Sequence, residues 1–111
     1  MIDIELLSAR LDHNEVVINK VLSIFSRQYG HVHSLFGPAA SSENTQEIYH
    51  LAHSLKGALM TMCANEDAAI AAKIEMTARN NEMPEPYLIK DIEQRVTTIN
   101  EQILSYLDAT A

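Results

Sequence analysis

Residues that often stabilise small or irregular folds are scarce in this sequence. Its 111 residues include one cysteine, three glycines, three prolines and no tryptophan, and aromatic residues make up 5% of the chain. The lone cysteine, Cys63, excludes an internal disulfide and suits a reducing compartment. The rest of the composition favours Ala, Leu, Ile, Glu and Gln over the β-branched and aromatic mixture of strands. This composition predicts an all-α protein.

Basic clusters and long apolar runs are also missing. The formal charge of −7 spreads along the chain, and no stripe of Lys and Arg is present to bind the phosphates of nucleic acid. No apolar run approaches the roughly 20 residues that a membrane-spanning helix needs. The start, "MIDIELL", lacks the basic and apolar regions of a cleavable signal. We therefore expect a cytoplasmic protein that binds neither nucleic acid nor a membrane.

Five segments carry apolar residues at helical spacing, without an internal repeat. They are a short segment capped by Asp3, a long one over residues 13–36, two over residues 43–62 and 65–79, and a last one that begins at Pro84 or Pro86. A capping box of Asp12 and Glu15 marks the start of the long segment, and "GPAASS" at 37–42 ends it. Asn65 is expected to cap the fourth segment. The length suits one hydrophobic core, so we expect a single domain over residues 1–111.

The last segment indicates how the helices pack. Its apolar residues alternate spacings of four and three: Leu88, Ile92, Val96, Ile99, Ile103 and Tyr106. This seam is typical of a helix packed at a shallow angle against antiparallel neighbours. Because the connections are short, consecutive helices must run in opposite directions. The pattern predicts an antiparallel up-down-up-down four-helix bundle with a short additional N-terminal helix. A coiled-coil dimer has the same seam, but the proline- and glycine-containing breaks favour a monomer.

The stretch "YHLAHSLKGALMTMCA", residues 49–64, places a histidine and a glycine one turn apart inside a helix. His53 projects roughly 150° away from the apolar stripe, and Gly57 lies roughly 40° from His53 on the same outward face. Glycine weakens a helix interior by about 1 kcal/mol relative to alanine, so its presence requires a reason. Helical side chains lean toward the N-terminus, and Gly57 therefore leaves the surface beside His53 uncovered.

Lys56 lies on the flank of this face, within reach of an anion attached to the imidazole. An exposed histidine is mostly neutral at neutral pH, so a ring nitrogen keeps a lone pair for attack on phosphorus. The stretch "AHSLKG", residues 52–57, resembles the signature of histidine-containing phosphotransfer (HPt) domains. That signature has an alanine, the phosphorylated histidine, any residue, an apolar residue, lysine and glycine. Chain length, helix count and motif position extend the resemblance over essentially the whole chain.

The resemblance implies roles for individual residues. His53 is then the phosphorylated residue, Lys56 stabilises the added phosphate, and Gly57 gives the partner room to approach. Family members place a polar residue on the next helix beside the histidine, and Glu75, with Arg79, sits at the matching place. Glu75 and Arg79 equally suit an ordinary i, i+4 surface pair.

The implied function is transfer of a phosphoryl group between aspartates of receiver domains in a two-component phosphorelay. The implied partners are response-regulator receiver domains and a hybrid sensor histidine kinase. No nucleotide-binding motif is present, so the chain is not expected to phosphorylate itself from ATP. No cofactor is expected here either, because Mg²⁺ belongs to the receiver. The chain looks free-standing, with a domain excised from a larger kinase as the alternative.

The second half of the stretch departs from the family pattern. Met60 and Cys63 stand where relatives have a small residue and a glycine. Met60 puts an adaptable apolar side chain near His53, and His50 borders the same surface. Because the left-handed cap that glycine favours is less available, Cys63 predicts a helix that runs slightly further.

Two alternatives use the same residues. A non-catalytic helical adaptor, a degenerate relative that binds receivers without accepting phosphate, is favoured by Met60 and Cys63. A metal site shared by His50 and His53 has i, i+3 spacing, and "EIYH" at 47–50 resembles half of a di-iron motif. Di-iron bundles direct two copies of that motif into the bundle core, whereas these residues point outward, so no metal is expected.

Overall fold

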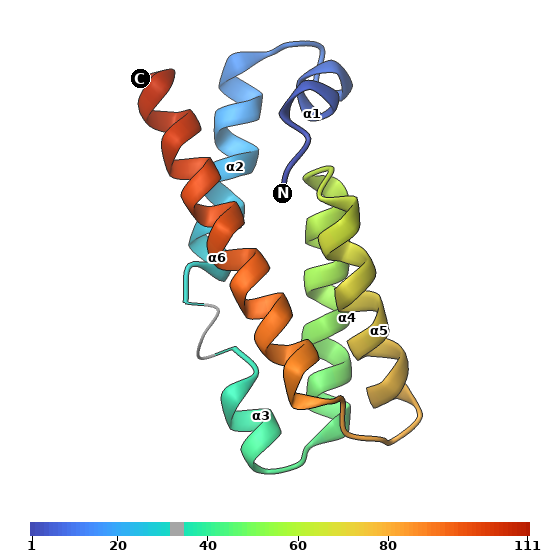
Figure 1. Ribbon diagram of the computed structural model, residues 1–111. Helices are drawn as coiled ribbons and strands as arrows, with labels where there is room; N and C mark the ends of the chain where they lie inside the picture. The colour runs from blue at the N-terminus through green and yellow to red at the C-terminus, as the bar shows by residue number, and fades with distance from the viewer. Residues whose placement is uncertain (32–34) are drawn as a thin grey trace.

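Six α-helices make up the part of the chain that the computed structural model describes, residues 1–31 and 35–111. They are α1 (Ile4–Arg10), α2 (Glu15–Tyr29), α3 (Gly37–Ser41), α4 (Thr45–Thr61), α5 (Asn65–Arg79) and α6 (Pro86–Ala109). The four long helices α2, α4, α5 and α6 run in alternating directions, while α1 and α3 lie at opposite ends of the molecule (Figure 1). This arrangement confirms the predicted all-α, up-down-up-down bundle.

One cluster of buried apolar side chains joins the long helices. Its fully buried members include Leu22 of α2, Leu55 of α4, Ile74 of α5 and Ile99 of α6. Burying a side chain of this size stabilises the fold by about 1.5–3 kcal/mol. The most extensive contact between two helices joins α4 and α5. Ala68, Ala71 and Ala78 are buried on α5, and such small side chains allow the two helices to approach closely.

None of the helices in the described ranges is long and apolar enough to cross a membrane.

The long segment predicted over residues 13–36 is wrong in its length, because α2 ends at Tyr29. Gly30 follows, and a Cβ atom there would lie only 2.7 Å from the carbonyl oxygen of Ser26. The backbone at the end of α2 therefore requires glycine at position 30, or it has to shift to make room for a side chain. Val32, which the prediction placed in the helix, lies outside the described residues. The "GPAASS" segment forms the short helix α3, with Pro38 in its first turn, where proline is well tolerated.

Two predicted helix caps are also wrong. Asn14, not Asp12, caps α2, and its side-chain oxygen accepts a hydrogen bond of 3.2 Å from the amide of Val17. Asp12 instead follows α1 in the left-handed conformation, with φ of 54°. Asn65 is the first residue of α5, and the residue in the cap position is Ala64, which makes no side-chain cap bond. A residue that favours caps therefore does not by itself locate a helix end.

Cys63 ends α4 in the left-handed conformation, with φ of 58°. The amide of Ala64 donates to the carbonyl of Leu59 at 2.9 Å, and the amide of Cys63 donates to that of Met60 at 3.1 Å. These two bonds form a Schellman motif, the usual helix stop with glycine at this place. The expectation that Cys63 lets the helix run further is wrong. Its side chain is buried in the core, which offsets the strain of the left-handed backbone.

A buried ion pair holds α5 against α6. Asp67 is 1% exposed, and its carboxylate lies 3.0 Å from Nη1 of Arg95 and 2.6 Å from the amine of Met1. The hydrogen bond to Asp67 raises the pKa of Arg95 above its ordinary value, against the opposing effect of burial. The pair lies two turns before Glu75 on α5, so it helps to set the register of that helix.

Candidate functional site

His53 of α4 and Glu75 of α5 meet across the contact between the two helices. Nδ1 of His53 lies 2.6 Å from Oε2 of Glu75. An ionised carboxylate only accepts hydrogen bonds, so Nδ1 carries the hydrogen and Nε2 of the neutral ring keeps a lone pair. The His53 side chain is 60% exposed. Nε2, and not Nδ1, is therefore the ring nitrogen with a free lone pair on an exposed side chain.

Lys56, three residues after His53, shares the same carboxylate. Its Nζ atom lies 2.7 Å from Oε1 of Glu75, so each carboxylate oxygen holds one of the two side chains. The Glu75 side chain is 14% exposed. Burial alone would raise the pKa of Glu75, but the hydrogen bonds from Lys56 and His53, with their charges, lower it below its ordinary value. Glu75 is therefore ionised at neutral pH and accepts from both neighbours.

Gly57 lies on the exposed side of α4, one turn after His53. A Cβ atom at this position would meet nothing within 4 Å. Its carbonyl accepts a hydrogen bond of 3.0 Å from the hydroxyl of Thr61, one turn later in the same helix. The glycine thus meets no packing requirement of the chain itself. It leaves open surface next to the imidazole, as its helical phase predicts.

Tyr49, one turn before His53, belongs to the site, although sequence reasoning misses it. Its ring centroid lies 5.9 Å from that of His53, with 22° between the two planes. The ring also meets His50 edge-on, with centroids 5.3 Å apart. Tyr49 is half-buried and packs against the core cluster. The available signal was the i, i+4 spacing of two flat rings on one helix.

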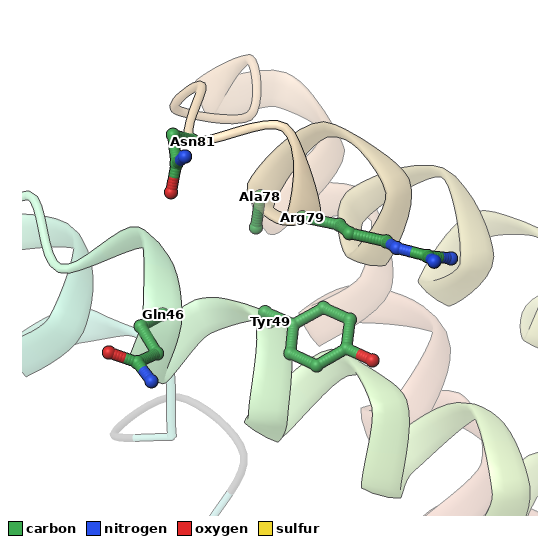
Figure 2. Close-up of a pocket in the computed structure, with 5 residues that line it drawn as sticks. All are labelled: Gln46, Tyr49, Ala78, Arg79 and Asn81. Atoms are coloured by element: carbon green, nitrogen blue, oxygen red, sulfur yellow. The ribbon is translucent and has the colours of Figure 1, made fainter.

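An open cavity of about 390 Å³ adjoins Tyr49 (Figure 2). Its walls are Gln46 and Tyr49 from α4, Ala78 and Arg79 from α5, and Asn81 from the turn after α5. Figure 2 shows that the side chain of Arg79 extends in the same direction as the ring of Tyr49. Arg79 thus lines this cavity, while Glu75 turns toward His53 and Lys56. The structure does not show the predicted alternative, an i, i+4 pair of Glu75 and Arg79.

The two remaining predicted residues lie on either side of His53. Met60 is 53% exposed and borders a groove with Lys56 and the alanine face of α5. His50 is exposed and contacts Tyr49. Within residues 1–31 and 35–111, no group of three or more His, Cys, Asp and Glu side chains is placed to hold a metal ion.

The comparison with protein families points in the same direction as this geometry. The model of the Hpt domain family matches residues 20–108, which is most of the chain. The chain therefore belongs to the Hpt domain family. Hpt domains are the histidine-containing phosphotransfer domains of phosphorelays, and they interact with receiver domains. Comparisons with curated proteins and with solved structures found no match.

The family match does not single out one histidine. The matched range contains four of the five histidines in the sequence, at positions 31, 33, 50 and 53. The choice of His53 rests on the surroundings of its own ring. His53 combines a carboxylate on Nδ1, a lysine on the same carboxylate and a clear surface beyond it.

Proposed function

We propose that this protein accepts a phosphoryl group on Nε2 of His53 from the aspartyl phosphate of one receiver domain and passes it to a second receiver. The observation that carries the proposal is the contact of 2.6 Å between Nδ1 of His53 and Oε2 of Glu75. This contact holds the hydrogen on Nδ1 and leaves the lone pair of Nε2 on the exposed ring. Membership in the Hpt domain family supports the reaction class.

The chemical step follows from this arrangement. The lone pair of Nε2 forms a bond to phosphorus, the bond from phosphorus to the aspartyl oxygen breaks, and the aspartate carboxylate leaves with the electron pair. The ring then holds hydrogen on Nδ1 and phosphorus on Nε2, so it carries a positive charge. The Glu75 carboxylate stabilises that charge. Attack by the carboxylate of a second receiver reverses the step and returns a neutral ring.

Lys56 supplies positive charge to the phosphoryl oxygens. Its side chain is 27% exposed, and its ammonium already lies beside the ring because Glu75 holds it. An ammonium has three donors, so Lys56 can keep one bond to Glu75 and give another to the phosphoryl group. Phosphoryl transfer depends mainly on such positioning and charge. The receiver would contribute the Mg²⁺ and its acidic pocket.

The docking face lies around Gly57, Met60 and His50, which are exposed on the same helix as His53. Gly57 gives clearance for the approaching receiver, and Met60 offers an adaptable apolar contact. A monomer with a small, transient interface suits a shuttle that exchanges partners. A hybrid sensor histidine kinase is the proposed source of the phosphate on the first receiver.

The test is to mix the protein with a phosphorylated receiver and follow acid-labile, alkali-stable label. We expect wild type and His13→Gln, an exposed histidine outside the matched range, to take up label and His53→Gln to take up none. Absence of label on wild type, or equal label on His53→Gln, would show the shuttle to be wrong. Wild type that binds the receiver without label would instead favour the adaptor.

A further inference from the structure

The contact between Tyr49 and His53 has no part in the mechanism above. A centroid distance of 5.9 Å with 22° between the planes is an offset stack, within the range of about 4.5–7 Å that aromatic pairs prefer. Glu75 holds one edge of the imidazole at Nδ1. Tyr49 stacks against the imidazole from the turn of α4 before His53, whereas Gly57 lies in the turn after it.

We propose that Tyr49 is a positioning residue that, together with Glu75, fixes the plane of the His53 ring. A single hydrogen bond at Nδ1 only partly restrains the ring, because the torsion about its Cβ–Cγ bond is intrinsically broad and roughly two-fold. A flat surface against the ring removes this freedom. Nε2 then points in one direction, toward an in-line phosphoryl group.

The stack also acts on charge. The ring becomes positively charged when phosphorus is on Nε2 and hydrogen is on Nδ1. A cation within about 6 Å of an aromatic centroid is attracted to the negative face of that ring, and the Tyr49 centroid lies at 5.9 Å. Tyr49 therefore stabilises the phosphorylated ring more than the neutral one. Its effect on transfer rests on the proposed function, whereas its effect on ring orientation does not.

The simpler role for Tyr49 is packing, since it also contacts the core cluster and His50. The two roles predict different results for two substitutions. Phenylalanine keeps a flat aromatic face, whereas leucine fills the space without one. If Tyr49 positions the ring, phenylalanine replaces it and leucine does not. If Tyr49 only packs, both substitutions give the same result.

The experiment compares Tyr49→Phe, Tyr49→Leu and Tyr87→Leu, where Tyr87 is a matched tyrosine on α6 that is 66% exposed. Imidazole ¹⁵N NMR reads the His53 tautomer, and phosphoryl uptake from a receiver gives the rate and the receiver's Kd. We expect one Nδ1–H tautomer in wild type, Tyr49→Phe and Tyr87→Leu, and a mixture in Tyr49→Leu. We expect Tyr49→Leu alone to transfer about tenfold more slowly at unchanged Kd, as a misplaced nucleophile would.

Equal spectra and equal rates for Tyr49→Phe and Tyr49→Leu would overturn the inference. Thermal unfolding checks the fold of each variant, and Tyr49→Met replaces Tyr49→Leu if the latter unfolds. If wild type takes up no label, the proposed function fails, and the NMR comparison still decides whether Tyr49 orients the ring.

Discussion

Oε2 of Glu75 lies 2.6 Å from Nδ1 of His53, and this contact leaves Nε2 as the ring nitrogen without a carboxylate partner. The other carboxylate oxygen lies 2.7 Å from Nζ of Lys56. Glu75 therefore joins His53, the proposed nucleophile, to Lys56, the cation proposed to bind the phosphoryl oxygens.

Replacing Glu75 by glutamine should slow phosphoryl uptake. Glutamine keeps the shape and still accepts a hydrogen bond from Nδ1, but it loses the charge that stabilises the positive ring. A charge-assisted hydrogen bond is roughly twice as strong as a neutral one, so we expect a loss of about tenfold in rate. Quenched-flow measurement of label transfer from a receiver gives this rate, with Glu66→Gln at the exposed start of α5 as control. Equal rates for the two variants would contradict the role of Glu75.

The lowered pKa of Glu75 predicts how the stability of the fold depends on pH. A carboxyl group whose pKa is lower in the folded state contributes stability above its ordinary value of 4.5, and this contribution disappears as the pH falls through the folded pKa. We therefore expect the free energy of unfolding to fall below about pH 4.5. Glu75→Gln should show a smaller fall, and urea unfolding between neutral and acid pH measures the difference. Parallel curves would mean that Glu75 is not paired in solution.

Gly57 should show opposite effects on stability and transfer. Because a Cβ atom there meets nothing within 4 Å, Gly57→Ala should raise the free energy of unfolding by about 1 kcal/mol. Gly57→Leu should fold equally well but slow transfer from a receiver, since its side chain covers the surface beside His53. Phosphoramidate, a small donor that needs no docking face, should label Gly57→Leu at the wild-type rate. A receiver rate that is also unchanged would remove the steric explanation of this glycine.

At position 63 glycine should give a more stable protein than alanine, which is the opposite of the order expected at position 57. Its φ of 58° is strained for any residue with a Cβ atom, and the side chain is 2% exposed. Both Cys63→Ala and Cys63→Gly lose the buried sulfur. The alanine variant keeps the strained left-handed backbone, whereas the glycine variant relieves that strain. We expect Cys63→Gly to be more stable than Cys63→Ala by about 1 kcal/mol in urea unfolding. The opposite order would place this backbone outside the left-handed region.

Asp67 should be the acidic residue whose loss costs most stability. Its carboxylate is buried between Arg95 and the amine of Met1. Asp67→Ala removes both charge-assisted hydrogen bonds but leaves only partly exposed cations behind, so we expect a loss of about 2 kcal/mol. Asp91 also contacts Arg95, but its side chain is 39% exposed, so Asp91→Ala should cost less than about 1 kcal/mol. Chemical denaturation compares the two variants, and similar losses would show that burial does not distinguish them.

Helix ends show where reading from sequence fails. Asp12, Glu43, Cys63 and Asn81 end helices in the left-handed conformation, whereas none of the three glycines adopts it. None of these helix ends therefore carries the glycine that usually marks the end of a helix. Gly30, at the end of α2, keeps a right-handed conformation, and a Cβ atom there would lie 2.7 Å from the carbonyl oxygen of Ser26. Both kinds of stop are set by local backbone contacts that residue preferences only weakly indicate.

The sequence by itself determined the bundle and the face that carries His53, Lys56 and Gly57. Apolar spacing and helical phase are properties of one helix, and these three residues lie within five positions of each other. Only the tertiary structure decided the partner of Glu75, because that depends on how α5 is shifted and rotated against α4. The same packing put Lys56 and His53 on one carboxylate and left Arg79 beside a cavity. These contacts join residues from different helices or depend on side-chain rotation, and neither is encoded in the spacing of a single segment.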